Sequence, residues 1–316
     1  MADEAPAPEV GGTDADAQPG SDAGTAIVAA LRALGERLDD LEPAALADEP
    51  DAVHQLRTHV RRLRSVLGAY RPLFEASISE SLRRRYRELG RELGTVRDIE
   101  VRVQVAELAL EDPPDGSTPG GLAAVRGHLV DAELEGHRLA HGRMVERQRM
   151  PRASARRLML ADFLDAPPLT PLAAGPADEV LGDLLEREAK RAVRRADRLT
   201  SSPAPEQLHA VRKAGRRLRY AAEAVTTDPL ELFGGKAEAL AEAGEELHDV
   251  LGDHRDEVLF AEHVRRAAAH AAHRGEPVEL LERLAEAADR RAAGHLDKLA
   301  KARRELRDAV DTWSSR

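Results

Sequence analysis

The chain has 316 residues, of which 42% are apolar, 33% charged and 3% aromatic, and its formal net charge is −10. This composition favours an α-helical protein with a core of Leu, Val and Ala, and an acidic protein is a poor general binder of nucleic acids or membranes. The sequence has no Cys, which excludes disulfides, thiol catalysis and Cys-ligated metals, and no apolar run is long enough for a membrane span.

Residues 1–24 contain six acids and no base, together with many Ala, Pro and Gly. Such a segment cannot bury enough apolar surface to fold, so we predict a disordered acidic tail. It also lacks the apolar stretch of a signal peptide, which favours a cytoplasmic protein. A first helix is expected over residues 25–41, where apolar side chains recur at helical spacing, followed by a Pro-containing connection over residues 42–52.

The second predicted helix ends near Pro72 and carries the basic motif H-x-x-R-x-x-x-R-R-L-R. Residues three and four apart are neighbours on a helix, so an apolar stripe is flanked by a basic stripe about 15 Å long. The basic stripe consists of His54, Arg57, Arg61 and Arg64, whereas Arg62 points away from it. Solvated charged faces normally interleave acids, yet residues 53–74 contain none. This pattern predicts an anion-binding face.

The remaining helices of the first half follow from periodicity and from breaks at Pro and Gly. We predict a long helix over residues 77–110, a loop over residues 112–121, and a helix from Leu122 that is interrupted at Pro151. A short helix over residues 153–164 follows. Residues 165–177 hold four prolines and are interpreted as the boundary between two halves.

The pattern then restarts, and the basic motif recurs 155 residues after its first copy. Helices are expected over residues 178–199, over the second copy of the basic motif, over residues 236–273, and from the turn at Pro277 to Trp313. The basic positions of the second copy of the basic motif are His209, Arg212, Lys213, Arg216, Arg217 and Arg219. Gly215 lies within this helix, where glycine is a poor helix former, and we interpret it as a close contact between helices.

A second motif, L-x-x-x-L-G-x-x-R-D, also occurs twice, from Leu89 to Asp98 and from Leu247 to Asp256. A period near 155 residues is far longer than a solenoid repeat, and each copy has four long helices with short connections. The sequence therefore predicts an all-α fold of two four-helix bundles, residues 25–168 and 177–314, related by internal duplication and a pseudo-twofold axis. Gly94 and Gly252 are expected to permit close helix packing.

The two basic motifs, each followed by L-G-x-x-R-D on the next long helix, resemble the CHAD family, the conserved histidine α-helical domain. The resemblance implies two helical bundles with twofold pseudo-symmetry and a basic surface that binds inorganic polyphosphate. It also implies association with polyphosphate granules. The residues implied to bind are His54, Arg57, Arg61, Arg62, Arg64, His209, Arg212, Lys213, Arg216, Arg217 and Arg219. The E-x-E-x-K motif of an adjoining triphosphate tunnel domain is absent from this sequence, which favours a stand-alone domain without a cofactor.

The chemistry of the basic stripes agrees with this implication. Polyphosphate offers only phosphate oxygens, and repeated guanidinium groups match them with bidentate hydrogen bonds. His54 and His209 either touch the ligand or only orient an Arg. Two roles stay open for the R-D residues of the L-x-x-x-L-G-x-x-R-D motif. The acids hold an Arg side chain of the basic helix in place, or the bases contact the ligand directly. These residues are Arg97, Asp98, Arg255 and Asp256. A further basic row that includes Arg194 and Arg198 either widens the surface or is a solvated face.

Three other functions remain as alternatives. A cluster of His and Asp could hold a divalent metal in a phosphohydrolase. Its residues are His248, Asp249, Asp253, His254, Asp256 and His263. A non-specific nucleic-acid binder is disfavoured because single-strand binders add aromatic platforms, which the stripes lack. A binder of acidic proteins is the third alternative. The favoured prediction is a non-catalytic polyphosphate-binding protein without a metal.

Overall fold

The computed structural model describes residues 21–114 and 116–315, which fold almost entirely into helices. The α-helices of the first half are α1 (Ala23–Leu46), α2 (Ala52–Ala69), α3 (Ala76–Glu111), α4 (Pro119–Arg126), α5 (Ala132–Gln148) and α6 (Pro151–Asp165). Those of the second half are α7 (Ala177–Asp197), α8 (Pro205–Glu223), α9 (Gly235–His273), α10 (Glu279–Asp297) and α11 (Leu299–Ser314). Short 3-10 helices are η1 (Arg71–Leu73) and η3 (Pro171–Ala174). The all-α prediction is confirmed.

Helix α1 differs from its prediction at both ends. It begins at Ala23 because Asp22 caps it, accepting the backbone N–H of Thr25 at 2.7 Å. It also continues past Pro43, which lies in the last turn, where a missing N–H breaks little of the helix. Residues 1–20 of the predicted acidic tail lie outside the described residues, whereas Asp22 and the buried Ala23 belong to the folded chain.

Two long predicted helices are each divided in the structure. The helix expected from Leu122 begins at Pro119, where Thr118 caps the backbone N–H of Gly121 at 3.1 Å. A π-helical segment, η2 (Gly127–Asp131), then separates α4 from α5. The last helix is interrupted at Lys298, which divides α10 from α11. Helical periodicity alone does not distinguish a continuous helix from two that follow one another closely.

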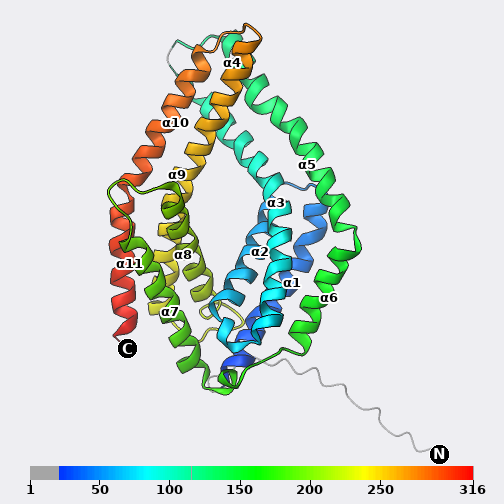
Figure 1. Ribbon diagram of the computed structural model, residues 1–316, viewed down its shortest axis with the longest axis vertical. Coiled ribbons are helices and arrows are strands. Elements are labelled where there is room, and N and C mark those ends of the chain that lie inside the picture. The colour runs from blue at the N-terminus through cyan, green and yellow to red at the C-terminus, as the bar shows by residue number, and fades with distance from the viewer. Residues whose placement is uncertain (1–20, 115, 316) are drawn as a thin grey trace, which may run out of the picture.

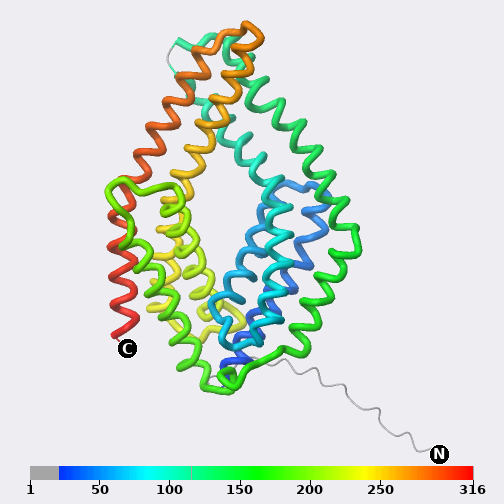
Figure 2. The backbone as a smooth tube through the Cα atoms, viewed as in Figure 1, coloured from blue at the N-terminus to red at the C-terminus, as the bar shows by residue number. Residues whose placement is uncertain are grey.

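The helices form two groups that lie side by side and meet again at one end of an elongated molecule (Figure 1). Helices α1, α2, α3, α5 and α6 make up one group, and α7, α8, α9, α10 and α11 the other. The motif helices α2 and α8, one from each group, contact each other where the groups meet. The long helices α3 and α9 run from the body of the molecule to the apex, where α4 and α10 pack (Figure 2).

The buried apolar residues form two separate cores. The larger core lies in the body and includes Leu63 and Leu67 of α2 together with Leu218 of α8. The smaller core lies at the apex and includes Ala106 of α3 and Phe260 of α9. Helices α3 and α9 contribute to both cores and thereby connect the body with the apex. In the described residues, no helix is long and apolar enough to cross a membrane.

Helices α8 and α9 cross at two glycines. A Cβ added at Gly215 would lie 2.8 Å from the carbonyl oxygen of Gly244, and one at Gly244 would lie 2.8 Å from the backbone nitrogen of Arg219. These are backbone atoms that cannot turn aside, so only glycine fits at either position. The interpretation of Gly215 as a close helix contact is confirmed.

Candidate functional site

The apolar stripes of the two motif helices anchor them in the body. In α2, the apolar positions Val53, Leu56, Val60, Leu63 and Leu67 are all buried, as predicted. Helix α8 begins at Pro205, whose missing N–H costs nothing at the first helical position, and the Gln207 side chain accepts the N–H of Ala204 at 2.9 Å. With one face of each helix fixed in this way, the basic stripes border the space between the two groups.

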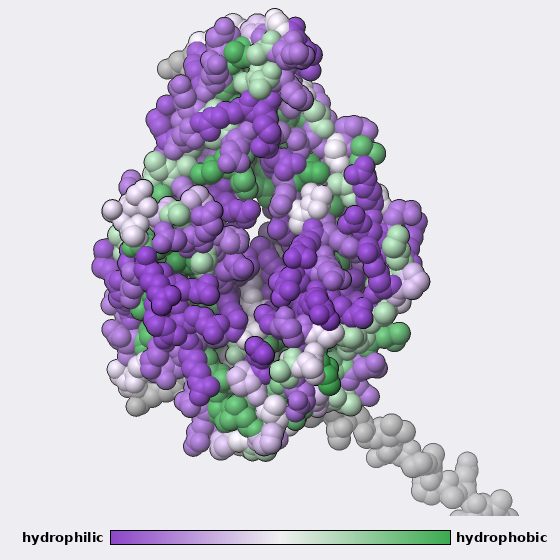
Figure 3. Space-filling view, viewed as in Figure 1, coloured by the Kyte–Doolittle hydropathy of each residue, from purple (hydrophilic) through white to green (hydrophobic). Residues whose placement is uncertain are grey.

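A central cavity of about 370 Å³ lies where α2, α3, α8 and α9 face one another. Figure 3 shows a hollow at the centre of the face of the molecule that is in view, rimmed largely by hydrophilic residues. The cavity joins residues of both predicted motifs. Its polar lining is His54, Arg57, Arg61, Arg97, Asp98, Arg102, Arg212, His248, Arg255, Asp256, Glu262 and Arg266. Seven of these are Arg and three are acids, so the lining has an excess of positive charge.

The two glycines of the L-x-x-x-L-G-x-x-R-D motif lie against arginine side chains, whereas we predicted that they permit close packing of helices. A Cβ at Gly94 would meet the Arg57 guanidinium at 3.4 Å, and one at Gly252 would meet that of Arg212 at 3.2 Å. Each glycine therefore leaves room for an Arg side chain from the neighbouring motif helix. Arg57 also donates to Asp98 Oδ1 at 3.0 Å, which fixes its direction, whereas Arg212 has no such bond to Asp256 among the described residues.

A second cavity, of about 380 Å³, lies between α2, α3, α7 and α8, and we call it the arginine chamber. Nine of its eleven lining residues are cationic, and the other two are Ser65 and Ala214. The cations are Arg61, Arg64, Arg83, Arg87, Arg191, Arg195, Lys213, Arg216 and Arg217. Arg61 lines both cavities, so the central cavity and the chamber are neighbours. The sequence motifs did not predict Arg83, Arg87 or Arg195, because these residues stand among acids on helices whose facing sides were unknown.

Several of these cations have no carboxylate partner. Among the described residues, no Asp or Glu oxygen lies within 4.0 Å of the side-chain nitrogens of Arg61, Arg64, Lys213 or Arg216. Burial, followed by the nearby Arg61 and Arg212, lowers the pKa of Arg216 to about 9. Burial, followed by Arg87 and Arg83, lowers the pKa of Arg64 to about 10. Both groups stay protonated at neutral pH, and the lowered pKa values reflect first burial and then positive charges crowded together.

Besides Arg57, three arginines of the predicted binding set are engaged in ion pairs. Arg62 donates to Glu223 Oε2 at 2.5 Å, reaching from α2 to the end of α8. In the reverse direction, Arg217 of α8 donates to the carbonyl of Gly68 at the end of α2 and to Glu188 at 2.7 Å. Arg219 pairs with Glu223 at 2.6 Å and with Glu245 at 2.7 Å. Arg62 and Arg217 thus join the two motif helices.

We expect Arg62→Ala to reduce stability more than ligand binding. Arg62 spans α2 and α8, but its partner Glu223 keeps Arg219, so the free energy of unfolding should fall by only about 1 kcal/mol. Urea unfolding of Arg62→Ala, Glu223→Gln and the double variant gives the coupling energy between the two side chains. Additive effects would show that the pair does not join the helices.

Neither motif histidine is bonded to a carboxylate among the described residues. Burial, followed by the charge of Arg97, lowers the pKa of His54, and burial, followed by Lys213 and Arg255, lowers that of His209. His54 lines the central cavity, whereas His209 is exposed beside it. A third histidine, His248, was predicted only as a metal ligand. Its Nδ1 lies 2.9 Å from Asp249 Oδ1, and its Nε2 is buried without a hydrogen-bond partner in the described chain.

The structure separates the residues of the alternative metal cluster. His254 Nδ1 lies 2.9 Å from the carbonyl oxygen of Ala292, and His263 Nδ1 lies 3.8 Å from Glu133. The described residues contain no group of three or more His, Asp or Glu placed to share a metal ion. Arg194 and Arg198 line neither cavity and are exposed, whereas their neighbours Arg191 and Arg195 line the chamber.

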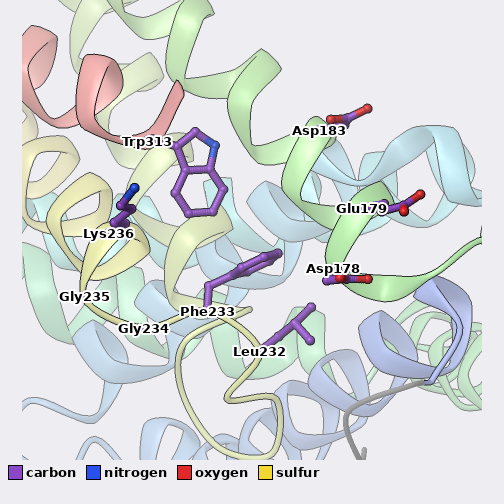
Figure 4. A pocket seen from close by; sticks show the side chains of 9 residues that line it. All are labelled: Asp178, Glu179, Asp183, Leu232, Phe233, Gly234, Gly235, Lys236 and Trp313. Carbon is purple, nitrogen blue, oxygen red and sulfur yellow. The ribbon is translucent and has the colours of Figure 1, made fainter. Parts of the chain in front are cut away.

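A larger cavity, of about 760 Å³, lies away from the motif helices and has the opposite charge. Figure 4 shows Asp178, Glu179 and Asp183 of α7 on one side of it, with Phe233 and Trp313 beside them. The two rings pack edge to face with centroids 5.2 Å apart. Three carboxylates against one lysine, Lys236, would repel an anion, so size does not identify the site here.

The fold and the site define an all-α protein with a cationic cavity between two helical groups. The family model of the CHAD domain matches residues 29–265, and the chain belongs to this family. Uncharacterized proteins from two strains of Mycobacterium tuberculosis are each 30% identical to it over 294 residues, covering 88% of this chain. The matched region covers 54% of each relative, so the chain spans about half the length of the curated relatives that it matches.

Two solved structures share the fold. PptA from Streptomyces chartreusis matches with a TM-score of 0.64 and 24% identity, covering 92% of this chain and 99% of that one. The CHAD domain from the plant Ricinus communis matches with a TM-score of 0.65 and 22% identity, covering 92% and 93%. At these identities the likeness establishes the fold alone.

Proposed function

We propose that this protein binds inorganic polyphosphate, without catalysis, in the central cavity and along the motif helices. The observation that carries the proposal is the set of cations without carboxylate partners, Arg61, Arg64, Lys213 and Arg216. The three arginines are half-buried, where unpaired charge is unfavourable, and a polyanion that enters would compensate several cations at once. Membership in the CHAD family and the resemblance stated above support the same ligand.

The residues that we propose for ligand contact are fewer than the motifs suggest. They are His54, Arg57, Arg61, Arg64, His209, Arg212, Lys213 and Arg216. We assign Arg62 and Arg217 to the junction of α2 and α8, because their ion pairs and the backbone contact of Arg217 already hold both side chains there. For Asp98 we propose the positioning of Arg57, on the basis of their 3.0 Å bond.

The proposal includes an internal duplication, in which residues 25–168 and 177–314 are two copies of one bundle domain. It is supported by the two motifs that recur in order and by the parallel contacts of Arg57 with Gly94 and Arg212 with Gly252. A cytoplasmic location at polyphosphate granules rests on the family resemblance.

A titration with polyphosphates of defined chain length tests the function, with phosphate release followed in the same samples. We expect saturable binding with no phosphate released, and log Kd should change linearly with log salt concentration, as for other polyanions. Single-stranded DNA and an acidic peptide serve as competitors. Release of phosphate, or equally tight binding of DNA at physiological salt, would overturn the proposal.

Binding should strengthen as the pH falls. Burial and neighbouring cations lower the pKa of His54 and His209 in the free protein, so both are neutral at pH 7. A bound polyanion would raise both pKa values, so protons are taken up on binding and affinity rises as the pH falls through the range between the free and bound values. Isothermal titration in buffers of different ionisation enthalpy measures this uptake.

Changing both histidines tests the origin of the pH dependence. In the variant His54→Gln His209→Gln, proton uptake should fall to the contribution of the polyphosphate end groups and of the other titratable group of the lining, His248. An unchanged proton uptake would show that these histidines do not approach the ligand.

A further inference from the structure

We infer that the polyphosphate path is one-sided: it leaves the central cavity past Arg61 into the arginine chamber, whereas the corresponding exit on the opposite side is closed by acids. This inference rests on the proposed function and adds a path and binding residues that lie outside the sequence motifs. It follows from a comparison of equivalent positions in the two halves.

The open side begins at the shared residue Arg61, which lines both cavities. Beyond it, Arg64 and Ser65 of α2 face Lys213 and Arg216 of α8 across the chamber. In the described part of the chain, two carboxylates hold chamber cations: Glu80 pairs with Arg83 and Arg87, and Glu188 pairs with Arg217 and Arg191. Nine cations against two carboxylates leave a large uncompensated positive charge, which attracts a polyanion.

The opposite side carries acids at the equivalent positions. Offset by 158 residues, Arg87 of α3 corresponds to Glu245 of α9, and Arg91 corresponds to Asp249. The mate of Arg64, at the offset of 155 in the motif helices, is Arg219. Arg64 has no carboxylate partner in the described residues, whereas Arg219 is held between Glu223 and Glu245.

The paired Arg219 has little left to offer a phosphate. Its Nε donates to Glu223 and its Nη1 lies 2.7 Å from Glu245, and these bonds raise its pKa against the opposing effect of burial. An anion approaching from this side would have to displace two carboxylates that repel it. The closed side therefore differs from the open side in charge at equivalent positions.

The inference predicts that chamber residues outside the motifs bind ligand. In the variant Arg87→Ala Arg195→Ala, affinity for long-chain polyphosphate should fall about a hundredfold, because each charge-assisted hydrogen bond contributes about tenfold or more. The matched control is Arg84→Ala Arg198→Ala, which removes exposed arginines from the same two helices outside the chamber. Arg219→Ala probes the closed side. The control and Arg219→Ala should bind as the unchanged protein does.

Binding is measured with each folded protein well below its melting temperature. If the alanine variant melts too low, Arg87→Gln Arg195→Gln removes the charges while keeping longer polar side chains. An affinity unchanged in the chamber variant, or a loss in Arg219→Ala as large as that in the chamber variant, overturns the one-sided path. Failure of the unchanged protein to bind polyphosphate would instead overturn the proposed function, so the two failures are distinguishable.

Discussion

Replacing Arg61, Arg64 and Arg216 together by Ala should abolish measurable polyphosphate binding while leaving the protein at least as stable. These three side chains have no carboxylate partner among the described residues, and the lowered pKa values of all three reflect burial among like charges. Three charge-assisted hydrogen bonds to phosphate correspond to a loss of about a thousandfold or more. Removing mutually repelling charges should leave the melting temperature unchanged or raise it.

A matched triple variant separates site chemistry from net charge. Arg84, Arg143 and Arg198 are exposed and line neither cavity, so their replacement by Ala removes the same charge elsewhere. Calorimetric titration and thermal melting of both triples provide the comparison. A similar affinity loss in both would reduce the site to general electrostatic attraction. A lower melting temperature in the first triple alone would mean that its cations serve the fold.

The substitution Gly215→Val should cost about 3 kcal/mol of unfolding free energy, among the largest effects of any single change in this chain. A Cβ at this position would lie 2.8 Å from the Gly244 carbonyl oxygen, and overpacking of rigid backbone forces the two helices apart. Helix α8 carries the second basic motif, so its displacement should also weaken binding. Urea unfolding measures the loss.

The control for this substitution is Gly136→Ala in the second turn of α5. Nothing lies within 4 Å of a Cβ added there, so the alanine should stabilise the helix by about 0.5–1 kcal/mol. If both glycine variants were equally stable, the close crossing of α8 and α9 would be wrong.

Much of the fold could be read from the sequence because the helices are long and strongly periodic. The buried stripes of α2 and α8 were predicted from spacing, and the close contact at Gly215 from the presence of a poor helix former within a helix. The interruptions at Gly127 and Lys298 were not, since they change the backbone without changing the apolar period. The role of Gly94 and Gly252 was also missed. A helical glycine has the same local signature whether a backbone or a guanidinium lies against it.

The candidate site could be predicted only in part, because a motif gives the face of one helix and not what lies opposite. The geometry that engages Arg62 and Arg219 depends on Glu223, which lies beyond the motif and faces back across the junction. Conversely, Arg87 and Arg195 join the chamber through the packing of α3 and α7 against the motif helices. Such long-range neighbours become visible only when the helices are assembled.

The division of the apolar residues into two cores has a consequence for local unfolding of the molecule. The apex core is small and packed separately from the core of the body, to which α3 and α9 connect it, so its amide protons can exchange through a local opening that leaves the body folded. The middle turns of these two helices border the central cavity, between one cooperative unit and the other. A polyanion bound across α3 and α9 would stabilise the closed state and so suppress that local opening. Amide exchange at the apex would then depend on whether the basic helices hold ligand.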